Sequence, residues 1–62
     1  MENKDLYVMY LKEGEKVIFE SLYGFTKKGT IKRNYKNGEF LVEYDSGTKD
    51  EVIGAEQIIF SI

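Results

Sequence analysis

An Asn-Gly dipeptide, Asn37-Gly38, separates two runs of alternating apolar and polar residues, and it constrains the fold more than any other feature of the chain. Asn-Gly favours the two-residue type I′ turn of a β-hairpin, because both central residues of that turn need a positive φ angle. Folding about this turn predicts that Arg33 pairs with Val42. One face of the hairpin then carries six residues, five of them apolar: Ile31, Arg33, Tyr35, Phe40, Val42 and Tyr44. A slip of one residue would lose this segregation, so the pattern predicts both the hairpin and its register.

The remaining segments are short and are separated by regularly placed glycines, which is typical of an all-β chain. The six glycines lie five to ten residues apart: Gly14, Gly24, Gly29, Gly38, Gly47 and Gly54. Residues 16–21 predict a strand with Val17 and Phe19 on one side, followed by a loop over residues 22–28. Residues 54–61 predict a four-residue helical turn and then a four-residue last strand.

An acidic turn occupies residues 45–48, with the sequence Asp-Ser-Gly-Thr. A three-residue loop with Gly47 in the left-handed conformation suits this turn, because an odd number of loop residues places Val52 on the same face as Val42. We therefore expect Val52 to face the core.

Residues 6–11 form an apolar run near the N-terminus, Leu-Tyr-Val-Met-Tyr-Leu. The pattern fits either a strand that is apolar on both faces or a short helix that begins at Asn3 or Asp5. The run is too short for a membrane span, and it lacks the basic start of a signal peptide. We therefore expect a cytoplasmic protein with no membrane partner, in which residues 1–12 pack on a β-domain at 13–62 or on a partner chain.

The segments 28–32 (Lys-Gly-Thr-Ile-Lys) and 40–48 (Phe-Leu-Val-Glu-Tyr-Asp-Ser-Gly-Thr) resemble the Tudor and KOW branch of the Src-homology-3-like (SH3-like) superfold. The order of the predicted elements over residues 13–59 is similar to that of these domains. The resemblance implies an all-β, small five-stranded SH3-like barrel, with an extra N-terminal strand or short helix and one helical turn before the last strand. Such barrels bind methylated peptides, RNA, DNA or proteins, and they are rarely enzymes.

The resemblance also implies an aromatic cage that captures methylated lysine or arginine by cation–π attraction. The matching positions are Tyr23 and Phe25 in the loop and Tyr44 in the middle of the sheet. The alternative is that Tyr44 lies in the core and Phe25 covers the open end of the barrel, because scattered aromatic residues in a small barrel usually serve packing. Trp, the strongest wall of such a cage, is absent from the chain.

The chain contains no Cys and no His, which excludes disulfides, thiolate and imidazole metal ligands, and catalysis by either side chain. Its three serines therefore have no histidine to act as a base. Asp50 and Glu51 are adjacent and point to opposite faces of a strand, so they do not form a carboxylate pair across a cleft. We expect neither an enzyme nor a bound metal or cofactor.

The net charge of −2 conceals a basic centre between acidic flanks. Residues 21–38 sum to +5, whereas residues 1–20 sum to −2 and residues 39–62 to −5. Aromatic residues lie within the basic segment, and such a mixture holds phosphates on cations while rings stack on bases. The candidate ligand-binding residues are Tyr23, Phe25, Lys27, Lys28, Arg33 and Tyr35.

The ligand expected at these residues is a nucleic acid or a nucleotide. Lys32 and Lys36 face Glu43 and Glu39 in the predicted hairpin, so they are weaker candidates. An ordinary solvated face is the alternative for the basic segment. A different alternative is a protein-interaction module, such as a small accessory or inhibitor protein that docks on a larger host protein through acidic or apolar surface.

Apolar residues in excess of one core occur at 6–11 and 58–62. A five-stranded barrel buries only its inner face, so apolar side chains on the outside need a cover. Small domains also gain stability from association. We therefore expect a homo-oligomer, and the candidate interface residues are Tyr7, Met9, Tyr10, Ile59, Phe60 and Ile62.

Overall fold

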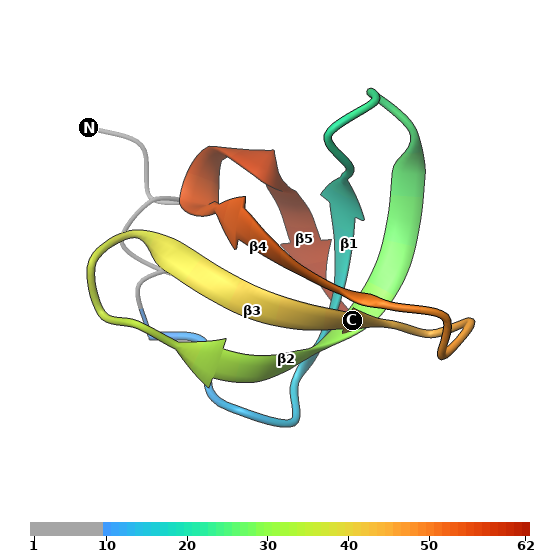
Figure 1. Ribbon diagram of the computed structural model, residues 1–62. Coiled ribbons are helices and arrows are strands. Elements are labelled where there is room, and N and C mark those ends of the chain that lie inside the picture. Colours follow the sequence, from blue (N-terminus) through green and yellow to red (C-terminus); the bar gives the residue numbers. More distant parts are fainter. Residues whose placement is uncertain (1–9) are drawn as a thin grey trace.

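A computed structural model of the protein describes residues 10–62, which form a single antiparallel sheet (Figure 1). Its strands are β1 (Lys16–Glu20), β2 (Thr26–Asn34), β3 (Glu39–Tyr44), β4 (Asp50–Gly54) and β5 (Ile58–Ser61). A single 3₁₀ turn, η1 (Ala55–Gln57), joins β4 to β5, and the strand order is β4-β3-β2-β1-β5. The predicted all-β class, the five strands and the helical turn before the last strand are confirmed.

The sheet curves around one hydrophobic core. The buried apolar residues are Leu11, Val17, Phe19, Ile31, Phe40, Val42, Tyr44, Ile53 and Ile58. Both edge strands contribute, since Ile53 lies on β4 and Ile58 on β5, and Figure 1 shows η1 turning the chain from one edge strand to the other. Within residues 10–62 these edge strands do not pair with each other. The sheet is therefore open between them, and the predicted closed barrel is not confirmed.

Strand β1 is buried on one side, as its sequence predicts. Val17 and Phe19 are fully buried, because alternate residues of a strand share a face. Strand β2 passes so close to its neighbours that only glycine fits at one position. A Cβ atom on Gly29 would lie 2.6 Å from the Glu43 carbonyl oxygen and 3.1 Å from Phe19 Cε1.

The loop expected over residues 22–28 is shorter in the structure. The Ser21 N–H donates to the Phe25 carbonyl oxygen at 2.8 Å, and β2 begins at the next residue. This hydrogen bond closes a tight turn, so β1 and β2 stay paired as far as Glu20 and Thr26. Lys27 and Lys28 therefore lie on a strand and not in a loop, which corrects the sequence prediction.

The β2–β3 hairpin forms, but its predicted register is wrong. Arg33 pairs with Leu41 instead of Val42 because the turn holds three residues instead of two. A β-bulge at Lys32 then adds an extra residue to β2, so Ile31 pairs with Val42. The bulge points Arg33 to solvent, whereas regular pairing would bury its guanidinium in the apolar face. Burial of an unpaired charge is costly, and this cost explains why the strand departs from simple alternation.

Beyond the bulge, the two faces of β2 are exchanged relative to the prediction. Asn34 turns inward, and its Nδ2 donates to the Leu11 carbonyl oxygen at 2.8 Å. Tyr35 turns outward and is 44% exposed. The expectation that Tyr35 shares the face of Phe40 is therefore wrong.

The turn between β2 and β3 has three residues, Lys36, Asn37 and Gly38, and not the predicted two. The Tyr35 N–H closes it by donating to the Glu39 carbonyl oxygen at 3.1 Å. Gly38 has a positive φ of 92°, as predicted, but the second positive φ, 64°, belongs to Lys36 and not to Asn37. Asn37 instead uses its Oδ1 to accept a hydrogen bond from the Glu39 N–H at 3.1 Å, which stabilises the wider turn.

The connection between β3 and β4 has four residues, 45–48, where three were expected. Gly47 adopts the predicted left-handed conformation, with a φ of 73°. The additional residue reverses the faces of β4, so Val52 is 50% exposed and Ile53 is buried. The expectation that Val52 faces the core is wrong, because Glu51 takes the inward position in that part of β4.

Only the last three residues of the N-terminal segment, residues 1–12, lie within the described part of the chain. Leu11 is 2% exposed and belongs to the core, whereas Tyr10 is 76% exposed. The predicted strand or short helix at residues 6–11 falls almost entirely outside the described residues. Over residues 10–62 no helix has the length and apolar character that crossing a membrane requires.

Candidate functional site

The outward face of β2 carries a row of cationic side chains. Gly29 and Ile31 face the core, so the residues that alternate with them face outward. The bulge then adds Arg33 to the outward side, and Tyr35 follows it. We call this row the β2 strip, and its members are Lys28, Thr30, Lys32, Arg33 and Tyr35. Three of the predicted ligand-binding residues, Lys28, Arg33 and Tyr35, therefore share one surface.

Within the β2 strip, Lys28 and Arg33 differ from Lys32 in their ion pairing. Among residues 10–62, ion pairs join Lys16 to Asp45 at 3.0 Å, Lys32 to Asp50 at 3.6 Å and Lys49 to Glu51 at 3.9 Å. Lys28 and Arg33 take part in none of these pairs, so their charges are open to an anionic ligand. The predicted pairing of Lys32 with Glu43 is wrong, because Thr30 lies opposite Glu43.

Tyr23, Phe25 and Lys27 lie at the other end of β2, and we call them the loop group. Tyr23 is 80% and Phe25 is 64% exposed on the β1–β2 loop. The Lys27 Nζ lies 5.8 Å from the centre of the Phe25 ring, within range of a cation–π contact. At about 3.3 Å per residue, up to about 26 Å of chain separates Lys27 from Tyr35. The structure therefore divides the predicted ligand-binding residues between two places and does not join them in one pocket.

Glu51 joins the start of the β1–β2 loop to β4, a role that the sequence does not indicate. Its carboxylate accepts a hydrogen bond from the Tyr44 hydroxyl and another from the Leu22 N–H at 3.3 Å. Burial raises the pKa of Tyr44 to about 12, with further contributions from the hydrogen bond to Glu51 and from its negative charge. Sequence reasoning missed this contact because the expected three-residue loop turns Glu51 outward.

Tyr44 does not belong to an aromatic cage. Its ring packs edge to face against Phe19 in the core, with centroids 5.3 Å apart and planes at 88°. Its hydroxyl is bonded to Glu51, while Tyr23 and Phe25 are exposed on the loop. The cage implied by the resemblance is therefore wrong at Tyr44, and the alternative that this residue lies in the core is confirmed.

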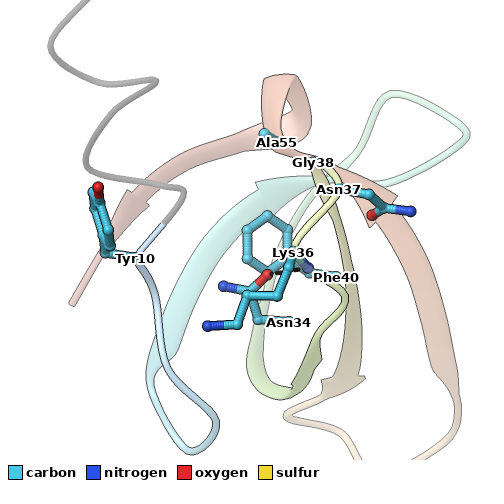
Figure 2. A pocket seen from close by; sticks show the side chains of 7 residues that line it. All are labelled: Tyr10, Asn34, Lys36, Asn37, Gly38, Phe40 and Ala55. Atoms are coloured by element: carbon cyan, nitrogen blue, oxygen red, sulfur yellow. Dashed lines mark hydrogen bonds between the residues drawn. The ribbon is translucent and has the colours of Figure 1, made fainter.

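A cavity of about 490 Å³, which we call the turn cavity, opens beside the β2–β3 turn (Figure 2). Its lining residues are Tyr10, Asn34, Lys36, Asn37, Gly38, Phe40 and Ala55. A second hollow of about 470 Å³ shares Tyr10, Asn34 and Lys36 with it. The sequence does not predict this cavity, because it depends on the wider turn and on residues from three distant segments.

Three residues of the predicted oligomer interface lie on or directly after β5. Ile59 is 44%, Phe60 is 54% and Ile62 is 69% exposed. Tyr10 lines the turn cavity instead, and Tyr7 and Met9 lie outside the described residues. Exposed apolar side chains thus occur along β5, an edge strand of the sheet.

The carboxylates are spread over the sheet rather than gathered in one place. Asp45, Asp50 and Glu51 each take part in an ion pair with a lysine. In the part of the chain that the structure describes, no three His, Cys, Asp or Glu side chains come together as a group that could hold a metal ion.

Comparisons with known protein families, with curated proteins and with solved structures find no match for this chain. The Tudor or KOW type implied by segments 28–32 and 40–48 therefore stays a prediction. The structure supports a coarser statement, namely an all-β domain of five antiparallel strands that is compatible with a small barrel-like fold.

Proposed function

We propose that this protein is a non-enzymatic binding module that holds a single strand of nucleic acid along the β2 strip. The observation that carries the proposal is the outward placement of Lys28 and Arg33 on one strand, where neither joins the ion pairs found among residues 10–62. Cations of this kind bind phosphate groups, and phosphate contacts supply the sequence-independent part of nucleic-acid binding. A ligand that carries phosphate groups, such as a nucleic acid, therefore suits this surface.

The spacing of the cations favours a polymer over a single nucleotide as the main ligand. The β2 strip follows a nine-residue strand, and the loop group lies at its far end. Phosphates recur along a nucleic-acid strand, so an extended row of cations contacts several of them. A single strand is favoured over a duplex, because the exposed rings of Tyr35 and Phe25 stack on bases that are not enclosed in a double helix.

Acidic side chains beside the β2 strip limit the strength of this binding. Glu43 lies opposite Thr30, and Glu39 lies opposite Tyr35. We therefore expect weak binding that depends strongly on salt. With about three phosphate contacts, the logarithm of the binding constant should fall with a slope of about −2 against the logarithm of the salt concentration.

Titration of a fluorescent single-stranded oligonucleotide at several salt concentrations tests this function. We expect Lys28→Glu and Arg33→Glu each to weaken binding about tenfold and to flatten the salt slope. Lys12→Glu is the matched control, because it reverses one lysine charge outside the β2 strip. Equal losses for Lys28→Glu and Lys12→Glu, or binding that does not respond to salt, would overturn the proposal.

The fold type that we propose with this function is a small SH3-like barrel of the Tudor or KOW type. The strand order β4-β3-β2-β1-β5, with η1 before the last strand, supports it. In such a barrel the outer faces of the middle strands and the connecting loops are available for ligands.

A second candidate function is a protein-interaction module, such as a small accessory protein on a larger host, and the β5 edge favours it. Ile59, Phe60 and Ile62 are exposed there, and residues 58–62 carry no charge. Exposed apolar residues on an edge strand usually mark a protein contact. Binding through this surface should persist at high salt. It should weaken in Phe60→Asp and stay unchanged in Lys28→Glu. A pull-down with and without nuclease separates the two functions.

The same edge supports the proposal that the chain forms a homo-oligomer. A small domain gains buried apolar area by association, and an interface built on Phe60 and Ile62 would supply it. Light scattering at about 100 µM, a concentration suited to modest affinities, measures the mass directly. If the unsubstituted chain has the mass of a monomer under these conditions, the homo-oligomer is excluded.

A further inference from the structure

The turn cavity is a site of a different kind from the β2 strip. Its volume of about 490 Å³ lies within the range of about 300–1,000 Å³ that ligand sites occupy. Phe40 is 1% exposed and lines the buried part of the cavity, and Ala55 of η1 lines another side. Tyr10, which is 76% exposed, stands to one side of these residues (Figure 2). The cavity therefore combines an apolar base with an exposed aromatic ring.

Lys36 is the one charged side chain among the described residues that line the turn cavity. It joins none of the ion pairs found in residues 10–62. Figure 2 shows its side chain beside that of Asn34, on the side of the cavity nearer to Tyr10. The described lining of the turn cavity holds a lysine and no carboxylate, and the adjoining hollow adds one lysine and one carboxylate, Lys12 and Glu13. The two together therefore favour an anionic group at Lys36.

The backbone of Lys36 is held in a conformation that a lysine rarely adopts. Its φ of 64° is the single positive value at a non-glycine residue in the described chain, and this region is unfavourable for any residue with a Cβ atom. Asn34 Oδ1 accepts a hydrogen bond from the Lys36 N–H at 2.9 Å, and the Ala55 N–H donates to the Gly38 carbonyl oxygen at 2.8 Å. These bonds tie the turn to β2 and to η1. Residues held in such conformations are found in tight turns and cluster at active sites and ligand-binding sites.

We propose that the turn cavity binds one nucleotide, with its base against Tyr10 and above Phe40 and its phosphate on Lys36. Aromatic rings stack on bases of any sequence, and a lysine ammonium group binds phosphate as a compact charge. The β2 strip ends at Tyr35, directly before Lys36 of the turn cavity, so a nucleic-acid strand that follows the outward face of β2 enters the cavity by passing round the β2–β3 turn. This inference rests on the proposed function, because it identifies where the end of the bound strand is held.

NMR titration of the full chain with a nucleoside monophosphate tests the inference. The backbone amides of Lys36, Gly38 and Ala55 should shift, with an affinity of about 1 mM. The nucleoside alone and inorganic phosphate alone should each bind at least fivefold more weakly, because each provides only half of the contacts. Equal binding of inorganic phosphate and of the monophosphate would overturn the assignment of the base to Tyr10.

Two variants identify the side chains that make the contacts. Lys36→Met removes the charge and should weaken monophosphate binding at least fivefold, and Tyr10→Ala should weaken it about tenfold through loss of stacking. Lys16→Met is the matched control, because the charge of Lys16 is already paired with Asp45. Lys36→Gly is a second variant that accepts the positive φ without strain, so it should fold and still lose the phosphate contact. Unchanged binding in both Lys36 variants would show that the inference is wrong.

The results also separate this inference from the proposed function. Oligonucleotide binding that depends on Lys28 and Arg33, with no amide shifts at Gly38 and Ala55 on adding monophosphate, would overturn the turn cavity and leave the β2 strip in place. Monophosphate shifts at Gly38 and Ala55, with oligonucleotide binding that ignores Lys28→Glu, would support the cavity and overturn the β2 strip.

Discussion

The Tyr44 hydroxyl donates a hydrogen bond to the Glu51 carboxylate, and this contact connects the core to the loop that carries Tyr23 and Phe25. Glu51 also accepts a hydrogen bond from the Leu22 N–H at 3.3 Å, and its side chain is 10% exposed. A buried carboxylate is costly unless donors compensate it. The start of the β1–β2 loop, at Leu22, is therefore anchored on a carboxylate that a core residue also binds.

Replacement of Tyr44 by Phe removes the hydroxyl and leaves the ring in place. Glu51 then loses its donor from the core, so we expect Tyr44→Phe to lower the free energy of unfolding by about 1.5–3 kcal/mol. Urea denaturation measures this change. The control is Tyr35→Phe, which removes a hydroxyl from an exposed ring and should change stability by less than about 0.5 kcal/mol. A Tyr44→Phe variant as stable as the parent would contradict the role of the contact.

The raised pKa of Tyr44 predicts a loss of stability at alkaline pH. Its folded value of about 12 lies above the ordinary value of 10.0, so the unfolded chain gives up this proton first as the pH rises. The stabilisation is complete below pH 10 and is lost progressively as the pH approaches 12. Unfolding curves measured across this interval should show the loss in the parent and a smaller loss in Tyr44→Phe. Identical pH profiles for the two proteins would refute the prediction.

Gly29→Ala tests the close packing of β2 against β3. The added Cβ would lie 2.6 Å from both the Glu43 carbonyl oxygen and Val42 Cγ1, and a backbone atom cannot move aside without breaking strand pairing. We expect a loss of about 3 kcal/mol in the free energy of unfolding, measured by thermal denaturation. Thr30→Ala, at the next position, should cost about 1 kcal/mol or less. Similar losses for both variants would argue against the close contact.

The conformation of Lys36 predicts that glycine is more stable than alanine at this position. Glycine accepts a φ of 64° without the steric cost of a Cβ atom, so Lys36→Gly should be about 1 kcal/mol more stable than Lys36→Ala. For a domain of this size, that difference corresponds to about 4–8 °C in Tm. Lys36→Ala is the matched comparison, since it also removes the long side chain but keeps the strain. Equal Tm values for the two variants would contradict the strained turn.

Local signals in the sequence were enough to predict the elements. Val17 and Phe19 alternate with polar residues and are buried together on β1, and the helical turn and last strand over residues 54–61 appear where the pattern places them. The positive φ angles at Gly38 and Gly47 follow from the same local rules. Each of these features depends on a few neighbouring residues, which is why periodicity and turn composition predict them.

Register and loop length were not predictable in the same way. The bulge at Lys32 moves Arg33 from the core side to solvent, and the four-residue connection at 45–48 exchanges Val52 for Ile53 in the core. A prediction from alternating apolar and polar residues assumes regular strand pairing. It does not include the cost of burying the Arg33 guanidinium, or the hydrogen bond that Glu51 makes with Tyr44 when it faces inward. Those energies arise only when distant strands come together.

The candidate sites also combine features that the sequence predicts with features that only the tertiary structure decides. The basic character of residues 21–38 is a property of composition, and it led to Lys28 and Arg33 without a structure. Their placement on the outward face of β2, and the cavity between Tyr10 and Lys36, were decided by tertiary structure alone. A linear pattern specifies which side chains are available, but the sheet pairing and the turns specify which of them lie side by side, because a shift of one residue moves a side chain to the opposite face.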